Sequence, residues 1–203
     1  MGAAAFTLGD KGYMGTGFIF QETEEDTIVG NSQRIYEYDP IQDEWLAMEL
    51  MGVRGRRRAV GMAIDGNGYI MTGITSSFFS RGLYRFNRTG GELGSWFESF
   101  NFDGGRRYAA VGFVIGNKGY LGGGSVTDEC GNVLPSFKDL WMYEPASDSW
   151  MQKSDIGGFF IQGSATFVLG NKAYLWGGNF VSDGPSINND FWIYTPDKEV
   201  FEM

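Results

Sequence analysis

The sequence predicts an all-β protein, a β-propeller whose visible part is four antiparallel, four-stranded blades. Three observations lead to this prediction. Two different motifs each occur four times with the same period, and 32 glycines and 16% aromatic residues accompany only 5 prolines. Such a composition favours short strands joined by tight turns over helices. A period of roughly 50 residues is typical of repeat proteins whose units stack on one another.

The first motif contains a tyrosine and reads GDKGYMGTG, DGNGYIMTG, GNKGYLGGG and GNKAYLWGG, with the tyrosines at Tyr13, Tyr69, Tyr120 and Tyr174. These tyrosines are 56, 51 and 54 residues apart. The second motif closes each repeat with an aromatic residue, at Trp45, Trp96, Trp150 and Phe201. We therefore expect a single propeller domain over residues 1–203, with blades at approximately 1–48, 56–99, 107–153 and 161–203.

The elements of one blade follow in order from the local pattern. The first strand alternates small and larger residues, as in AVGFVI from Ala110, and a period of two indicates a strand. A turn of Asn and Gly leads to the second strand, which carries the tyrosine and ends in glycine. The third strand carries aromatic residues such as Tyr36 and Tyr38, and the fourth opens with Trp or Phe, as at Trp45. We expect these aromatic residues to pack between blades that stack radially.

The stretch GNKGYLGGG, residues 116–124, raises the question of a phosphate-binding loop. A phosphate cradle needs glycines that open a helix, because the free N–H groups and the dipole of the helix N-terminus bind the anion. Here strands flank the glycines, and no helical period follows them. We interpret the glycines as structural, at the end of a crowded second strand.

An arginine before a small-residue strand, a tyrosine strand that ends in two glycines, and a tryptophan downstream together resemble the kelch repeat. The glycine pair is complete in repeats three and four, and Thr replaces its first member in repeats one and two. The arginine is present near Arg56 and Arg107, whereas Ile161 takes its place in repeat four. The resemblance covers nearly the whole chain. It implies the fold, but kelch propellers include binding scaffolds and enzymes alike.

The number of blades leaves three interpretations open, since kelch propellers usually have about six or seven. The chain is a fragment of a longer propeller, a closed four-bladed ring, or an open arc that a second copy completes through its open blade edges.

Composition excludes several classes of function. The formal charge of −9 and a pI near 4.5 argue against a nucleic-acid partner. No apolar run is long enough for a membrane span, and the N-terminus shows no signal peptide. The sequence leaves the location open, and an extracytoplasmic one is compatible with a chain that belongs to a longer precursor. Histidine is absent and Cys130 is the one cysteine, so we expect no cofactor, no imidazole or thiolate metal site and no Ser-His-Asp arrangement.

The candidate binding residues lie at two places. Arg57 and Arg107 precede first strands, where a channel mouth is expected. Either one arginine per blade makes structural hydrogen bonds and salt bridges between blades, or the extra arginines hold a carboxylate by bidentate contacts. The loops between second and third strands vary most and commonly form the binding face of a propeller. The candidates at the channel mouth and on this loop face are Arg57, Arg107, Arg34, Arg81, Asp128 and Glu129.

The sequence thus predicts a non-enzymatic binding module for a protein or a carbohydrate. The alternative is a sugar-modifying enzyme that resembles the sialic acid mutarotase type, with an arginine and a carboxylate at the channel mouth. Galactose oxidase resembles the chain at the same distant level, but its copper site needs histidines that this chain lacks.

Overall fold

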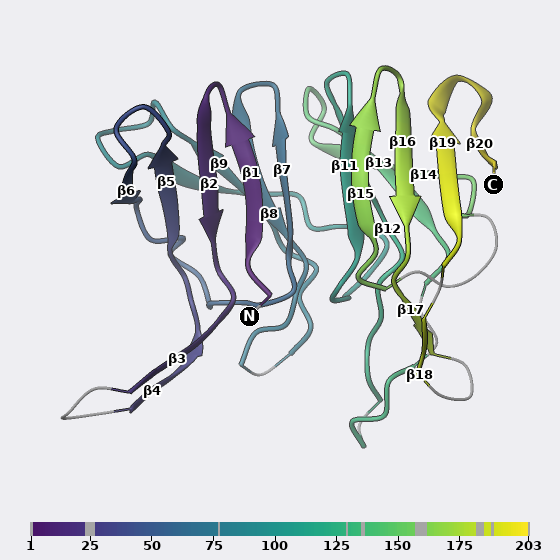
Figure 1. The fold of residues 1–203 in the computed structure, drawn as a ribbon, viewed down its shortest axis with the longest axis horizontal. Helices are drawn as coiled ribbons and strands as arrows, with labels where there is room; N and C mark the ends of the chain where they lie inside the picture. Colours follow the sequence, from purple (N-terminus) through teal and green to yellow (C-terminus); the bar gives the residue numbers. More distant parts are fainter. Residues whose placement is uncertain are drawn as a thin grey trace. The chain divides into compact units, whose positions relative to one another are not determined.

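The computed structural model describes residues 2–22, 27–76, 78–128, 130–134, 137–156, 162–181, 185–187 and 189–202. The chain divides into two compact units, Met1–Asn101 and Phe102–Met203, which are described one at a time (Figure 1). Each unit contains two four-stranded antiparallel sheets, as the repeat pattern predicts. No helix among the described residues has the length and apolar character that a membrane crossing requires.

Unit 1 holds the first two blades. Blade 1 pairs its strands in the order β1 (Ala4–Leu8), β2 (Lys11–Gly15), β5 (Ile35–Asp39) and β6 (Glu44–Ala47). Blade 2 has the order β7 (Val60–Ile64), β8 (Asn67–Met71), β9 (Leu83–Asn87) and β10 (Ser95–Ser99). In both blades the two-residue turn between the first and second strands includes a glycine with positive φ, as the Asn- and Gly-rich sequence predicts.

Unit 2 repeats the arrangement. Blade 3 consists of β11 (Val111–Ile115), β12 (Lys118–Gly122), β13 (Leu140–Glu144) and β14 (Ser149–Lys153). Blade 4 consists of β15 (Ala165–Leu169), β16 (Lys172–Trp176), β19 (Phe191–Thr195) and β20 (Val200–Glu202), with a short 3₁₀ helix, η1 (Pro196–Lys198), before its last strand. All four blades are therefore meanders of the predicted kind.

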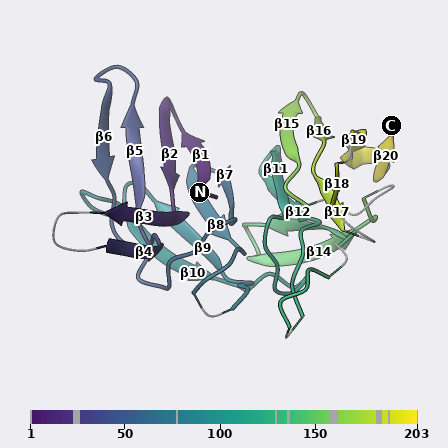
Figure 2. The same cartoon turned by 60° about the horizontal axis from the view of Figure 1, so that its bottom comes forward.

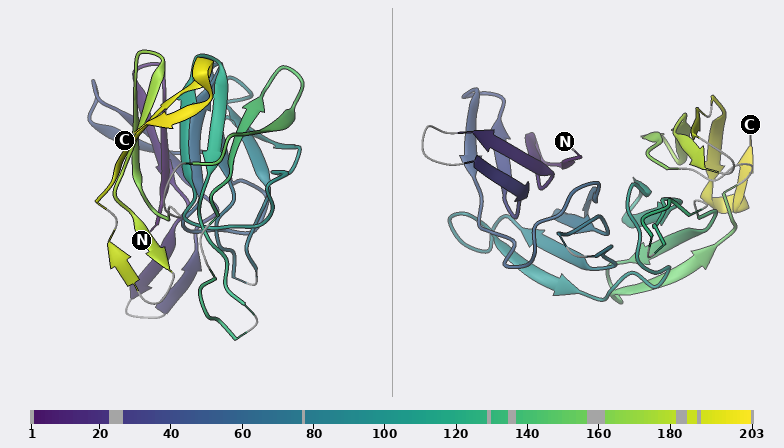
Figure 3. Two further views of the ribbon diagram at one scale, coloured as in Figure 1. Left: turned by 90° about the vertical axis from the view of Figure 1, so that its right-hand side faces the viewer. Right: turned by 90° about the horizontal axis from the view of Figure 1, so that it is seen from below.

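Two loops form strands that the sequence did not predict. The loop after β2 contains a ribbon of β3 (Phe18–Glu22) and β4 (Thr27–Asn31), which lie side by side in Figure 2. The loop after β16 contains β17 (Asn179–Val181) and β18 (Pro185–Ile187). In unit 1 the ribbon extends from the end of blade 1 that lies opposite to the β1–β2 turn. In unit 2 the ribbon extends from the end of blade 4 that lies opposite to the β15–β16 turn (Figures 1 and 3).

Close packing between the two blades of unit 1 explains the small residues of the first strands. A Cβ atom added at Gly61 would lie 2.6 Å from the carbonyl oxygen of Ala5, so blade 2 can approach blade 1 only with glycine there. The stacked rings of Phe6 and Tyr13 pack in the same core as the fully buried Ile70. Burying each such large side chain contributes about 1.5–3 kcal/mol, and this is why the blades stack.

The core of unit 2 is built in the same way. The rings of Phe113 and Tyr120 stack at 5.1 Å, and Tyr194 of blade 4 packs against both. Thr166 donates its hydroxyl to the carbonyl oxygen of Gly112 at 2.9 Å, which ties the first strands of blades 3 and 4 together. The repeat tyrosines Tyr13, Tyr69 and Tyr120 are thus core residues, whereas Tyr174 of blade 4 is half-buried.

The glycine-rich stretch of blade 3 has a structural role. Gly124 has a φ of +79°, and a Cβ atom there would lie 2.7 Å from the carbonyl oxygen of Tyr108. The next residue, Ser125, exchanges backbone hydrogen bonds with Tyr108, so the chain before β11 runs directly beside this stretch. This close approach agrees with the interpretation made from the sequence.

The aromatic residues of blade 1 differ from the prediction. Tyr36 and Trp45 were expected to pack between blades, but they are 42% and 53% exposed. Together with Met14 they lie on the face of blade 1 that no other blade of unit 1 covers, whereas Tyr13 lies on the face that blade 2 covers. Their repeat position alone could not reveal this, because it does not show whether a blade has a neighbour on both faces.

Candidate functional site

Arg107 is completely buried and takes part in a structural ion pair. Its guanidinium donates to both carboxylate oxygens of Asp139, at 2.6 and 2.8 Å, and to the carbonyl oxygens of Gly123 and Gly104. The ring of Phe137 lies 4.0 Å from the guanidinium carbon. The bidentate geometry is the one expected for an anion site, but the anion is a side chain of the same blade.

Arg56 occupies the same repeat position in blade 2 and is also buried, with other partners. It donates to the carbonyl oxygen of Thr72 and the hydroxyl of Ser80, both at 3.3 Å, and lies over the ring of Tyr84. Gly82 stands where blade 3 has Asp139, so this blade provides no matching carboxylate. Burial lowers the pKa of Arg56.

Arg57 anchors the β3–β4 ribbon to blade 2. Its guanidinium donates to the side-chain oxygen of Asn31, the last residue of the ribbon, at 3.2 Å. It also lies over the ring of Phe18, the first residue of the ribbon. The amide of Asn31 in turn donates to the carbonyl oxygen of Ile74. The structure thus joins Arg57 to the loop after β2, a link that the sequence analysis did not foresee.

The remaining candidates lie in the loops. Arg34 is half-buried just before β5, and Arg81 is exposed before β9. Asp128 accepts hydrogen bonds from the backbone amides of Cys130 and Asn132 and from the Asn132 side chain, and these lower its pKa. Glu129 lies outside the described residues. Among the described residues, no group of three or more acidic, Cys or His side chains is placed to hold a metal ion.

Exposed apolar side chains on the ribbon were missed by the sequence analysis. Phe20 and Val29 are cross-strand partners, and they are 65% and 57% exposed. Directly opposed residues of an antiparallel pair project from the same side of the ribbon, so the two side chains form one apolar surface. The available signal was the β-branched and aromatic residues of FIFQE and TIVGN, which favour strands.

A buried polar cluster joins the two blades of unit 1. Glu37, opposite Tyr13 in the sheet, accepts hydrogen bonds from the Tyr13 hydroxyl and from Arg88 of blade 2, and Lys11 lies 3.0 Å from it. Burial disfavours the ionised carboxylate, but the hydrogen bonds from Arg88, Tyr13 and Lys11 outweigh burial and lower the pKa of Glu37 to about 2. Burial and the bond to Glu37 raise the pKa of Tyr13.

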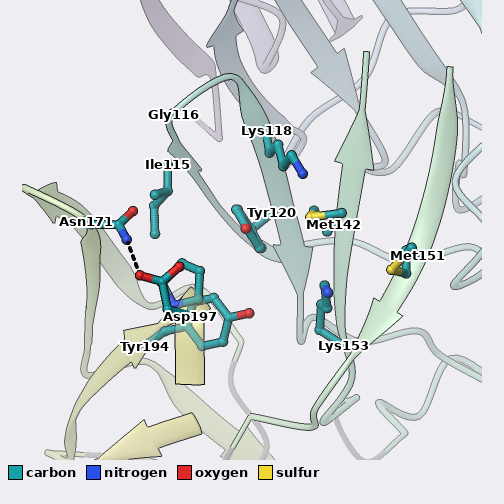
Figure 4. A pocket seen from close by; sticks show the side chains of 11 residues that line it. Ile115, Gly116, Lys118, Tyr120, Met142, Met151, Lys153, Asn171, Tyr194 and Asp197 are labelled. Carbon is teal, nitrogen blue, oxygen red and sulfur yellow. Dashed lines mark hydrogen bonds between the residues drawn. The ribbon is translucent and has the colours of Figure 1, made fainter. Parts of the chain in front are cut away.

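The corresponding place in unit 2 is a cavity of about 480 Å³ at the turn end of blades 3 and 4 (Figure 4). Polar groups from both blades line it, and its apolar wall includes Met142 and Met151. The hydroxyl of Tyr194 is buried there without a hydrogen-bond partner. The polar side chains that line the cavity are Lys118, Tyr120, Lys153, Asn171, Tyr194 and Asp197.

Comparison with solved structures places the fold. The structure of YjhT matches with a TM-score of 0.78 at 17% sequence identity, and the match covers 98% of this chain and 64% of that chain. The chain has a β-propeller fold. No protein-family model and no curated protein sequence matches it. The chain thus spans less than two thirds of the YjhT chain, and the likeness at this identity concerns the fold of its four blades.

Each of the two arginines predicted at the channel mouth makes its contacts within its own unit. Arg107 is buried with Asp139, whereas Arg57 contacts the ribbon. The open features among the described residues include the apolar ribbon surface of unit 1, the uncovered face of blade 1 around Trp45, and the turn-end cavity of unit 2.

Proposed function

We propose that the chain is a non-enzymatic binding module of the kelch propeller type that binds a protein or a carbohydrate through its loop face. The observation that carries the proposal is the apolar pair of Phe20 and Val29 on a ribbon that Arg57 holds to blade 2. Exposed aromatic and aliphatic side chains on an anchored element supply contact area at little cost in conformational entropy. This surface favours a protein ligand over a carbohydrate.

The test measures binding of the full chain to two probes, a random peptide display library and a glycan array. We expect the library to yield peptides that bind Phe20→Ser about tenfold or more weakly than the natural chain. An aromatic side chain that becomes buried at an interface typically contributes at least that much to binding. Ile41→Ser is the matched control, since Ile41 is 84% exposed in the β5–β6 turn of the same blade. Equal loss in both variants, or binding only to glycans through other residues, would contradict a protein-binding ribbon.

The second candidate is an enzyme of the sialic acid mutarotase type. The observation in its favour is that Arg107 and Asp139 converge, as an arginine–carboxylate site requires. Against it, Arg107 is completely buried, so a substrate could reach the pair only if blade 3 opened. Proton NMR of an acidic sugar, with and without the protein, measures anomer interconversion. A rate equal to that in buffer supports the non-enzymatic proposal, and a faster rate that Arg107→Lys abolishes supports the enzyme.

A further inference from the structure

We propose that the turn-end cavity of unit 2 binds a small organic carboxylate, which takes the place that the Glu37 carboxylate holds in unit 1. The cavity lies between β12 and β13 of blade 3 and β19 of blade 4 (Figure 4). Its volume of about 480 Å³ falls in the range of small-molecule sites. The β11–β12 and β15–β16 turns, which contribute Gly116 and Asn171 to its lining, lie at the opposite end of unit 2 from the β17–β18 ribbon (Figure 1). This inference therefore does not depend on the loop face.

Unit 1 shows what the repeat tyrosine and lysine bind. In blade 1 the residue opposite Tyr13 is Glu37, and its buried carboxylate receives Tyr13, Lys11 and Arg88. The second strand of blade 3 retains the tyrosine and the lysine as Tyr120 and Lys118. The chain therefore contains one copy of this site with its carboxylate built in.

In unit 2 the carboxylate is missing. The residue opposite Tyr120 is Met142, so blade 3 has no carboxylate opposite its repeat tyrosine. Blade 4 presents Tyr194 where blade 2 has Phe86, and this change adds a hydroxyl to the core. That hydroxyl belongs to a completely buried side chain and has no hydrogen-bond partner. A buried donor without an acceptor is rare in folded proteins, and here it points toward the cavity that Tyr194 lines (Figure 4).

The charges around the cavity allow an anion close to the two lysines. Lys118 pairs with Glu144 at 3.4 Å, and Lys153 pairs with Glu199 at 2.6 Å. In unit 1 Lys11 contacts Glu37 at 3.0 Å and Asp39 at 3.3 Å, so one lysine in this position serves two carboxylates. The ammonium group of Lys118, which holds this position in blade 3, can therefore donate inward while it keeps its outer partner.

The other residues that line the cavity indicate the chemical character of the part of the ligand beyond its carboxylate. Ile115, Met142 and Met151 form an apolar wall, and Asp197, exposed at the rim, accepts a hydrogen bond from Asn171 at 3.1 Å. Asp197 repels a second anionic group and accepts hydrogen bonds from hydroxyls. The site thus fits a monocarboxylate with an apolar or hydroxylated body better than a dicarboxylate or a phosphate.

Methyl NMR of the methionines in the full chain tests the proposal, because Met142 and Met151 line the cavity. The probes are isovalerate and glucuronate, each compared with its uncharged amide, isovaleramide and glucuronamide. We expect saturable shifts of these two methyl signals with at least one acid and about tenfold weaker binding of its amide. Equal binding of acid and amide, or no saturation by either acid, overturns the proposal.

Three variants locate the site. Met142→Glu places a carboxylate where unit 1 has Glu37 and should abolish binding of the acid. Because this variant lacks Met142, binding is measured from the Met151 methyl signal. Tyr194→Phe removes the unpartnered hydroxyl and should weaken binding by about tenfold. Tyr174→Phe, on the repeat tyrosine of blade 4 outside this cavity, should leave binding unchanged. Unaltered binding in Tyr194→Phe overturns the proposal, even if Met142→Glu does not fold.

Discussion

The hydroxyl of Tyr13 donates a hydrogen bond to the carboxylate of Glu37, its direct cross-strand neighbour in blade 1. Glu37 is only 3% exposed, and Arg88 reaches it from blade 2. The ion pair therefore links two blades whose other contacts are mainly apolar. Because apolar burial has no direction, this buried pair also fixes how far one blade slides along the other.

Replacement of Glu37 by Gln should destabilise unit 1 by an amount on the order of 3 kcal/mol near neutral pH, because Arg88 loses a buried counter-charge. The pKa of Glu37 falls from 4.5 to about 2 on folding, so its ionised form stabilises the folded state fully above pH 4.5. This contribution disappears as the pH falls through 2. Denaturant unfolding of both proteins between pH 7 and pH 2 should show their difference shrinking below pH 4.5.

Glu44→Gln is the control for this experiment, since Glu44 is an exposed residue of β6 in the same blade. Its unfolding free energy should stay within about 0.5 kcal/mol of the natural chain at every pH. A difference between natural chain and Glu37→Gln that stays constant from pH 7 to pH 2 would show that folding does not change the pKa of Glu37, and would contradict this prediction.

Replacement of Arg107 by Met should cost about 3–5 kcal/mol, because Asp139 would keep a desolvated charge without its partner. Asp139→Leu should cost a similar amount. The double variant should lose much less than the sum of the two, and the resulting coupling energy is measured by urea unfolding in a double-mutant cycle. Additive losses would argue that the two groups act independently.

Arg81→Ala is a suitable comparison because Arg81 is exposed. We expect its unfolding free energy to change by less than about 0.5 kcal/mol. The contrast also bears on function: the sequence assigned Arg81 and Arg107 to the same binding role, and only the buried one should affect stability.

Replacement of Gly124 by Ala should destabilise unit 2 by at least about 2 kcal/mol, since its φ of +79° and the nearby Tyr108 carbonyl both oppose a side chain. Gly30→Ala on β4 is the matched change, because a Cβ atom there meets nothing within 4 Å. Thermal unfolding of both variants provides the comparison. A Gly124→Ala protein as stable as Gly30→Ala would contradict the structural role of the glycine-rich stretch.

Removal of the Arg57 side chain should loosen the β3–β4 ribbon without unfolding blade 2. Arg57→Ala loses the hydrogen bond to Asn31 and the contact with Phe18. Amide hydrogen exchange in Phe18–Glu22 and Thr27–Asn31 should become about tenfold faster, while exchange in β8 stays the same. Faster exchange throughout blade 2 would instead assign Arg57 a role in the blade itself.

The repeated motifs were enough to predict the blades. Tyr13, Tyr69, Tyr120 and Tyr174 recur at one position of a four-stranded pattern, and local backbone preference together with strand alternation determines that pattern within a few residues. The turns at Asn67 and Asn117 and the small residues at Gly61 and Gly112 have the same local or near-local origin. Such features could be predicted from the sequence because they recur in the repeats.

What differs between blades could not be predicted in this way. Glu37 and Arg88 are 51 residues apart, and nothing in the repeat pattern states that they meet. Tyr194 continues an aromatic position of the repeat, and only its neighbours reveal that its hydroxyl has no partner. Phe20 and Val29 lay in what the pattern marked as a loop, although their strands pair in register.

The sequence by itself determined the four blades, the order of their strands and the structural role of the stretch from Gly116 to Gly124. The tertiary structure decided which charges are buried, so that Arg107 pairs with Asp139 inside blade 3 while Arg57 holds a ribbon. It also decided that one inter-blade site is filled by Glu37 and its counterpart beside Met142 is open. The reason is physical: strand periodicity is a local property, whereas charge pairing and cavities depend on distant side chains that only folding brings together.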